Sequence, residues 1–375
     1  MSEDTNATFN DLYRRINAKD KQILSTEILA QGDLPVVDQG KSQIAGYTNN
    51  LAKRFTPPDG GVIVFGDHTR IVKFVDFDFA IGADGTQLIA ARGDNDTRFL
   101  AFLLSAQEVP NTGYNRHFKF LKEMTFSVPT LPEQQAIAAA LSDADGAVAG
   151  LERVIAKKRL IKQGAMQDLL TARRRLPGFS GEWEEATISD VAHVDPEALG
   201  AGTPKDYAFR YISLEDVNQG VLSGWTDVAF GSAPSRARRI LQKDDVLLGT
   251  VRPNLKSHML FDRLGADWVG STGFAVLRPR PEKSIPGYLF ELIMSDVIGR
   301  QIDEVIAGSN YPAISNSDVR KLKVLLPSID EQKAIASVLR DMDAEIQTLE
   351  SRLAKARAVK EGMMQNLLIG RVRLV

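Results

Sequence analysis

Apolar and polar positions along the chain alternate between short strand-like runs and two long helical stretches. In residues 133–176 and again in residues 331–374, apolar residues recur at alternating spacings of three and four. This spacing places them on one face of an α-helix, as in a heptad repeat. A helix of roughly 40 residues extends about 60 Å. The pattern therefore predicts two long amphipathic helices.

Each helical stretch opens with a capping pattern. Thr130 and Ser328 stand three residues before Glu133 and Glu331. A hydroxyl at the N-cap and a carboxylate three residues later can satisfy the free N–H groups of a first helical turn. The apolar face of the two helices is interrupted by lysines, namely Lys158, Lys162 and Lys360.

The two helical stretches are copies of each other. At a constant offset of 198 residues, 22 of the 44 positions of residues 133–176 are identical in residues 331–374. Because the period is a whole domain plus a long helix, it indicates a duplicated unit and not a solenoid. A heptad helix can pair with another chain, but two equivalent helices in one chain can also pair with each other. We favour the second interpretation, with antiparallel helices and a pseudo-twofold internal repeat.

The segments between the helices have the pattern of mixed α/β domains. Short apolar runs flanked by Gly, Pro and Asp indicate strands at 62–65, 71–75 and 87–91, and at 246–248, 258–261 and 274–277. Apolar runs at 99–105 and 288–297 indicate one helix after each strand group. The expected fold class is α+β, with two α/β domains separated by two long antiparallel coiled-coil helices. The expected boundaries are 1–129, 130–176, 177–327 and 328–375.

Composition narrows the cellular context. The chain has no cysteine, which suits a reducing cytosol, and a net charge of −2. The first 15 residues lack an apolar signal core, and no apolar run of about 18 residues could span a membrane. These features predict a cytoplasmic protein without a membrane partner.

Motifs for catalysis are scarce. The four histidines are scattered without metal-ligand spacing, and the adenine-methyltransferase tetrapeptide and metal-nuclease motifs are not found. Residues 39–42 (QGKS) resemble the end of a phosphate-binding loop, but Pro35 stands where the required earlier glycine would be. The sequence therefore predicts a non-catalytic chain without a bound metal or cofactor.

Basic and amide side chains on predicted loops indicate a nucleic-acid contact. Arg252 and Asn254 follow a predicted strand, and such side chains can read guanine and adenine through paired hydrogen bonds. The alternative is that these are ordinary solvated loop charges. The full set of candidate DNA-binding residues is Lys53, Arg54, His68, Thr69, Arg70, Tyr114, Asn115 and Arg116 in the first domain, and Arg236, Arg238, Arg239, Arg252, Asn254, Lys256, Asn310 and Tyr311 in the second.

The repeated stretches also carry a family pattern. Residues 128–138 (VPTLPEQQAIA) and 326–336 (LPSIDEQKAIA) each precede a long helix that ends in Met-Gln-x-Leu-Leu. They resemble the two conserved regions of specificity subunits of type I restriction-modification systems. Residues 176–183 (LPGFSGEW) resemble the junction that opens a target recognition domain in that family, and residues 34–41 with 44–47 resemble part of one recognition-domain class.

The resemblance implies a DNA-recognition subunit without its own active site. Each recognition domain would contact one half of a bipartite target in double-stranded DNA, and the helices would fix the distance between the halves. Two methylation subunits would dock on this chain and bring S-adenosylmethionine. Restriction subunits would bring ATP and Mg²⁺ for translocation and cleavage. Half-sites about 34 Å apart are within reach of such a spacer.

The first domain departs from the second in one respect. The second opens with Trp183 and a short alternating run at 186–191, whereas the first 20 residues contain no matching tryptophan element. We expect either a start upstream, or a first domain that is incomplete or borrows a strand. Two other functions remain open: a specificity subunit of a different bipartite restriction-modification system, and a coiled-coil scaffold that does not read bases.

Overall fold

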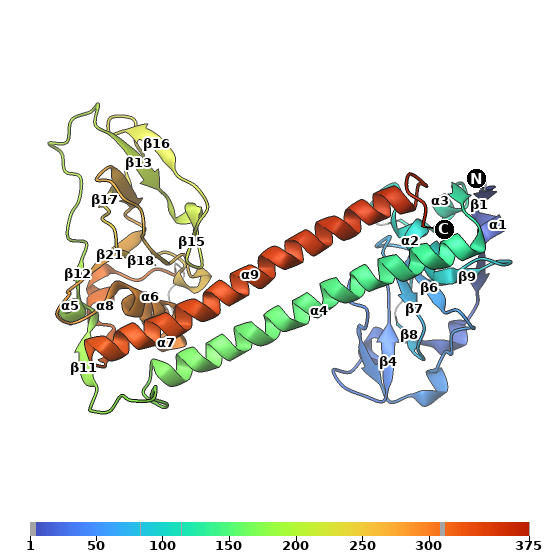
Figure 1. Ribbon diagram of the computed structural model, residues 1–375, viewed down its shortest axis with the longest axis horizontal. Helices are drawn as coiled ribbons and strands as arrows, with labels where there is room; N and C mark the ends of the chain where they lie inside the picture. The colour runs from blue at the N-terminus through green and yellow to red at the C-terminus, as the bar shows by residue number, and fades with distance from the viewer. Residues whose placement is uncertain (1–4, 83, 114, 308–311, 375) are drawn as a thin grey trace. The chain divides into compact units, whose positions relative to one another are not determined.

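The computed structural model describes residues 5–82, 84–113, 115–307 and 312–374, and Figure 1 labels many of its elements. The chain divides into two compact units. Unit 1 comprises residues 1–153 and 350–375, and unit 2 comprises residues 154–349. Both division points fall inside the two long helices, α4 (Leu131–Leu169) and α9 (Ile329–Leu367). Each unit therefore holds one α/β part, half of α4 and half of α9.

Unit 1 contains two four-stranded sheets and a two-stranded ribbon. In spatial order the first sheet is β2 (Tyr13–Ile16), β9 (Thr86–Ala91), β6 (Val62–Gly66) and β7 (Val72–Val75), with all neighbours antiparallel. The second is β3 (Gln22–Ile23), β8 (Ala80–Gly82), β4 (Leu34–Val37) and β5 (Gly46–Thr48). The ribbon joins β1 (Thr5–Thr8) to β10 (Thr125–Val128). The helices are α1 (Phe9–Leu12), α2 (Thr97–Ser105) and α3 (Phe118–Leu121).

Unit 2 repeats the first sheet in the same order. The corresponding strands are β12 (Ala192–Val194), β21 (Phe274–Pro279), β18 (Val246–Gly249) and β19 (Met259–Leu260), again antiparallel throughout. The second sheet is β16 (Thr226–Ala229), β13 (Ala208–Ile212), β20 (Trp268–Ser271) and β17 (Ala237–Ile240). The two ribbons are β11 (Glu184–Thr187) with β22 (Lys323–Leu326), and β14 (Val217–Asn218) with β15 (Val221–Leu222). The helices are α5 (Ile188–Val191), α6 (Pro286–Met294), α7 (Asp296–Ile306) and α8 (Asn316–Lys321).

The central strand of each first sheet is buried on both faces. In β6, Ile63 and Phe65 pack into the core with α2, whereas Val62 and Val64 pack into a second core on the other face. A strand covered on both sides needs apolar residues at every position, which explains the continuous apolar run in the sequence. The predictions of strands and of the helix at 99–105 are confirmed. The predicted helix at 288–297 is two helices, because Ser295 adopts an extended conformation between α6 and α7.

Unit 1 contains an N-terminal strand that its sequence does not predict. Residues 5–8 form β1 and pair with β10, as β11 pairs with β22 in unit 2. The expectation that the first domain lacks or borrows this strand is therefore wrong. Thr8 and Asp11 form a capping box at α1, as Thr187 and Asp190 do at α5. The match lies in this polar capping pattern and not in a tryptophan.

The repeated Glu-Gln pair fastens each long helix to its unit. In unit 1, the Gln134 side chain donates to the Pro129 carbonyl (2.9 Å) and accepts from the Asp96 amide (2.9 Å), just before α2. The same two contacts in unit 2 join Gln332 to Pro327 and to Ile285, just before α6. Both glutamines are buried, so these hydrogen bonds satisfy polar groups that water cannot reach.

The glutamate of each pair binds an arginine from the segment that follows the other long helix. Both carboxylate oxygens of Glu331 accept N–H groups of Arg175, at 2.5 and 2.6 Å. In unit 1, Arg373 lies 3.5 Å from Glu133. Arg175 and Arg373 are themselves related by the 198-residue offset, as are the two glutamates. Ser328 accepts from the Glu331 amide (3.3 Å) as predicted for an N-cap, and the glutamate carboxylate is held by the arginine.

Within each unit the halves of α4 and α9 run antiparallel and are joined by ion pairs. In unit 2, Lys162 contacts Asp343 (2.6 Å) and Lys158 contacts Glu345 (2.7 Å). In unit 1 the partners are Lys360 with Asp145, and Arg357 with Glu152. The lysines that interrupt the apolar face in the sequence therefore reach acids on the opposite helix.

A buried carboxyl group makes the stability of unit 2 depend on pH. Glu291 on α6 is 3% exposed, and burial raises its pKa to about 7 despite Lys162 at 3.7 Å, with Asp343 adding to the rise. A raised pKa means that the folded state holds the proton more tightly than the unfolded state. This contribution is therefore complete below the ordinary glutamate pKa and is lost as the pH rises through about 7.

Glu291→Gln tests this linkage. Between pH 6 and pH 8, we expect the wild-type free energy of unfolding to fall by about 1 kcal/mol more than that of the variant. Urea unfolding at both pH values, followed by circular dichroism, measures the difference. Equal pH dependence in the two proteins would show that the Glu291 carboxyl does not titrate in this range.

Candidate nucleic-acid interface

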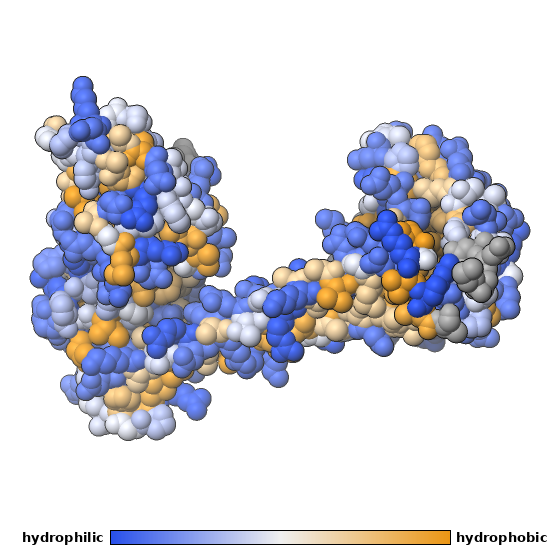
Figure 2. Space-filling view, turned by 45° about the horizontal axis from the view of Figure 1, so that its top comes forward, coloured by the Kyte–Doolittle hydropathy of each residue, from blue (hydrophilic) through white to orange (hydrophobic). Residues whose placement is uncertain are grey.

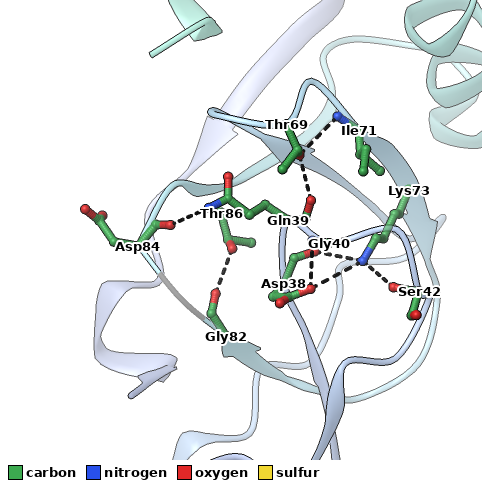
Figure 3. A network of polar contacts seen from close by, with 10 residues as sticks. All are labelled: Asp38, Gln39, Gly40, Ser42, Thr69, Ile71, Lys73, Gly82, Asp84 and Thr86. Atoms are coloured by element: carbon green, nitrogen blue, oxygen red, sulfur yellow. Dashed lines mark hydrogen bonds and ion pairs between the residues drawn. The ribbon is translucent and has the colours of Figure 1, made fainter. Parts of the chain in front are cut away.

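In unit 1, a buried lysine organises the loop that carries the Gln-Gly-Lys-Ser sequence. The ammonium group of Lys73 on β7 donates to the carbonyl oxygens of Asp38 (2.8 Å) and Ser42, and lies 3.7 Å from the Asp38 carboxylate (Figure 3). Burial lowers the pKa of Lys73, and the Asp38 carboxylate opposes this shift. A buried ammonium group must use its donors within the protein, so these contacts fix the course of residues 38–42.

Gln39 then joins this loop to two neighbouring turns. Its carbonyl accepts from the Thr69 hydroxyl (2.6 Å), and its side chain donates to the Asp84 carbonyl (3.0 Å) (Figure 3). The side chain also accepts from the His68 amide (3.2 Å). Gly85 adopts φ +91°, and a Cβ there would stand 2.7 Å from the His68 ring. Only glycine allows this close approach.

Five of the predicted residues of unit 1 gather at these turns. His68 lies 3.3 Å from the Asn115 carbonyl, and Arg116 lies 3.4 Å from Asp84. Arg70 adopts a left-handed conformation (φ 63°), and its guanidinium donates to the Val109 carbonyl (3.1 Å). Thr69 and Arg70 also line a pocket of about 570 Å³ with residues 107–111. The five residues are His68, Thr69, Arg70, Asn115 and Arg116.

The other predicted residues of unit 1 have different surroundings. Lys53, at the end of the 3-10 turn η3 (Leu51–Lys53), donates to the Asp20 carbonyl (2.9 Å). Arg54 forms an ion pair with Asp78 (3.5 Å). Tyr114 lies outside the described residues. Lys53 and Arg54 therefore contact other residues than Gln39, Lys73 and the turns that these two residues join.

In unit 2, the loop after β18 presents two side chains to solvent. Arg252 and Asn254 are exposed on either side of Pro253. Arg252 is the N-cap of the 3-10 turn η5 (Pro253–Leu255), and Asn254 lies within it. Arg252 has φ 48° and its amide donates to the Pro312 carbonyl (2.7 Å). A guanidinium and a carboxamide held in this way can bind base edges or phosphates.

Lys256 closes the same turn. It also adopts a left-handed conformation (φ 51°), and its ammonium group donates to the Met294 carbonyl (2.9 Å) and lies 3.5 Å from Asp296. Lys256 therefore anchors the turn to α6 and α7, and much of its charge is used within the protein.

The three arginines at β17 differ in their availability. Arg236 is exposed. Arg238 lies over the Phe230 ring (4.8 Å), and Arg239 pairs with the buried carboxylate of Asp195 (2.9 Å). Arg239 is thus engaged in a structural ion pair. The Arg236 carbonyl accepts a hydrogen bond from the Thr272 amide, and the carbonyl of the next residue, Gly273, accepts one from the Thr250 hydroxyl. Arg236 is therefore connected to the segment that leads into the Arg252 turn. Asn310 and Tyr311 lie outside the described residues.

Sequence reasoning missed three residues that shape these sites. Gln39 and Lys73 organise the turns of unit 1, and Leu255 stands 56% exposed between Asn254 and Lys256. The QGKS pattern singled out residues 39–42 for their likeness to a phosphate-binding loop, and not for the contacts that they make here. A lysine within the alternating pattern of a strand gives no sign that its amine is buried.

The described residues hold no group of three or more His, Asp or Glu side chains that could bind a metal ion. Among those same residues, no helix is both long and apolar enough to cross a membrane. The chemistry that these sites offer is hydrogen bonding and ion pairing from loops.

Comparison with known proteins gives consistent matches. A family model described as the type I restriction modification DNA specificity domain matches residues 9–158 and 180–357. The chain is 23% identical over 277 residues to the type I restriction enzyme MjaVIII specificity subunit of Methanocaldococcus jannaschii, which covers 68% of this chain and 64% of that protein. A putative MjaX specificity subunit of the same organism is 23% identical over 270 residues, which covers 68% and 60%. The matched region thus spans just under two thirds of these curated relatives.

The fold is also similar to that of a solved structure. The crystal structure of the type I restriction-modification system S subunit from M. genitalium aligns with a TM-score of 0.66 and 17% identity, over 98% of this chain and 96% of that one. The two family matches together cover most of the chain, one in each α/β part. The chain therefore belongs to the family of type I restriction modification DNA specificity domains.

Proposed function

We propose that this chain is the DNA-recognition subunit of a type I restriction-modification complex. Each α/β part would read one half of a bipartite duplex target, and the chain itself would catalyse no reaction. The observation that carries the proposal is the turn at residues 252–256. It presents an exposed guanidinium and an exposed carboxamide on a pinned backbone, within a family of DNA specificity domains.

The long helices suit a spacer role. Two ion pairs related by the 198-residue offset, Lys162 with Asp343 and Lys360 with Asp145, support a pseudo-twofold, antiparallel coiled coil. The equal strand order of the first sheets supports two equivalent recognition domains. We place them at residues 1–129 and 177–327, with helical spacers at 130–176 and 328–375.

The helices would also dock two methylation subunits. Apolar side chains are visible among polar ones along the helical segments (Figure 2), and exposed apolar residues there are Val154, Leu160, Ile161 and Val359. Bound methylation subunits would bring S-adenosylmethionine, and restriction subunits would bring ATP and Mg²⁺. The assembly would work in the cytoplasm, where the host DNA lies.

A methylation map of the host genome tests the proposal. We expect modified adenines in one split motif, and we expect all of them to disappear when the gene for this chain is deleted. Restoring the gene should restore the same motif. An unchanged map after deletion would contradict the proposal, and equal binding of random and motif-bearing duplexes by the purified complex would favour a scaffold that does not read bases.

A further inference from the structure

An apolar side chain stands at the tip of the turn that presents Arg252 and Asn254. Leu255 is 56% exposed, although burying a leucine side chain is favourable. A single exposed leucine is common on protein surfaces. This one differs because the backbone on both sides of it is held in an unfavourable conformation.

The strain lies at the two residues that flank the turn. Arg252 and Lys256 both have left-handed φ angles, at 48° and 51°, although neither is glycine. Such a conformation is unfavourable for a residue with a side chain, and it persists only where the surroundings impose it. Residues of this kind concentrate at functional sites.

Contacts from three directions impose this conformation. The Arg252 amide donates to Pro312, and the Lys256 ammonium donates to Met294 at 2.9 Å. Nδ1 of the buried His258 accepts from the Gly249 amide (3.0 Å), which joins the chain segments that lead into and out of the turn. Burial lowers the pKa of His258 to about 4, so the ring is neutral and can accept at neutral pH. The turn is therefore rigid, and Leu255 is kept in solvent.

We propose that Leu255 packs against the 5-methyl group of a thymine in the half-site read by unit 2. This inference rests on the proposed DNA-reading function. In the major groove, thymine alone presents a methyl group among the hydrogen-bonding base edges. The neighbouring guanidinium and carboxamide can bind guanine and adenine edges, whereas a leucine side chain has only apolar surface to offer. The turn would thus read a short sequence that contains at least one thymine.

Removing the methyl group of one thymine at a time from the DNA tests this contact. The purified complex with its methylation subunits is bound to duplexes in which each thymine of the mapped motif, on either strand, is replaced in turn by uracil, which lacks only the methyl group. For the wild-type complex we expect one uracil to reduce affinity about fivefold, the effect of one lost methyl contact. In Leu255→Ala the same uracil should reduce affinity less than twofold.

Leu264→Ala is the matched control, because Leu264 is an exposed leucine of the same unit, 76% exposed, outside the turn. This variant should keep the full fivefold uracil effect. Thermal unfolding of Leu255→Ala should match the wild type, since the side chain is more than half exposed.

Three results would overturn the thymine contact: uracil without effect at every thymine, an undiminished uracil effect in Leu255→Ala, or a second half-site that contains no thymine. If uracil has no effect and Leu255→Ala also loses DNA bending, the leucine acts as a wedge between base pairs instead. Failure of the wild-type complex to prefer the motif over random DNA would instead contradict the proposed function itself.

Discussion

Replacing Arg252 and Asn254 together with alanine is expected to remove discrimination at one half-site, with a loss of about 10³-fold in preference for the correct sequence. Each paired hydrogen-bond contact to a base contributes roughly 1–3 kcal/mol of discrimination, and two contacts near the middle of this range give about 4 kcal/mol. Both side chains are exposed and the backbone that carries them is pinned. The variant should lose base contacts without losing the fold.

Competition binding measures the effect. Duplexes with single base-pair changes in each half-site are compared with the mapped motif, and selectivity should fall at one half-site and persist at the other. Arg263→Ala serves as control, because Arg263 is a half-exposed cation of unit 2 that lies 3.4 Å from the neighbouring Asp262, outside the Arg252 turn. This control should at most weaken binding to all sequences alike. Unchanged selectivity in the double variant would place the reading residues elsewhere.

Replacing Arg175 with methionine is expected to destabilise unit 2 by about 3 kcal/mol. Glu331 is 1% exposed and both of its carboxylate oxygens bind Arg175. Removing one partner of a buried pair leaves a charge without compensation, which typically costs about 3–5 kcal/mol. We take the lower end because a quarter of the Arg175 side chain is exposed. Arg175 also lies over the Trp183 ring, at 5.5 Å, so some packing is lost as well.

The internal repeat provides a control for this effect. Arg373→Met removes the equivalent arginine of unit 1, whose distance to Glu133 is 3.5 Å, and should therefore cost less. Adding Glu331→Gln to Arg175→Met should recover part of the loss, because the buried charge is then absent. Urea unfolding of the four proteins gives the comparison. A stability of Arg175→Met equal to that of the wild type would show that Glu331 finds another partner.

The elements that sequence predicted best are those whose pattern is local. The long helices follow from a spacing of three and four with a hydroxyl at the start, and β6 follows from five consecutive apolar or small residues. The strand at residues 5–8 was missed because its sequence, TNAT, has no apolar run. It forms because it can pair with the edge of β10, a strand that lies about 120 residues further along the chain.

The sites divide in the same way. The sequence placed Arg252 and Asn254 on a loop after a strand, and the structure finds them exposed there. It could not show that Arg239 is engaged by Asp195, or that Lys53 is engaged by the Asp20 carbonyl. Basic residues look alike in a sequence, and only their neighbours in space decide which charges remain available.

The sequence by itself determined the two long helices and the repeat between them, because periodicity, capping and repetition are properties of neighbouring residues and of the copy itself. That the α/β parts are copies as well is a prediction from the same repeat. Only the tertiary structure decided that each unit combines the first half of one long helix with the second half of the other. It also decided that Arg175 and Arg373 neutralise Glu331 and Glu133, and that Leu255 is held in solvent by a strained turn. Those features depend on hydrogen bonds and ion pairs between residues far apart in the chain, whose partners no local pattern specifies.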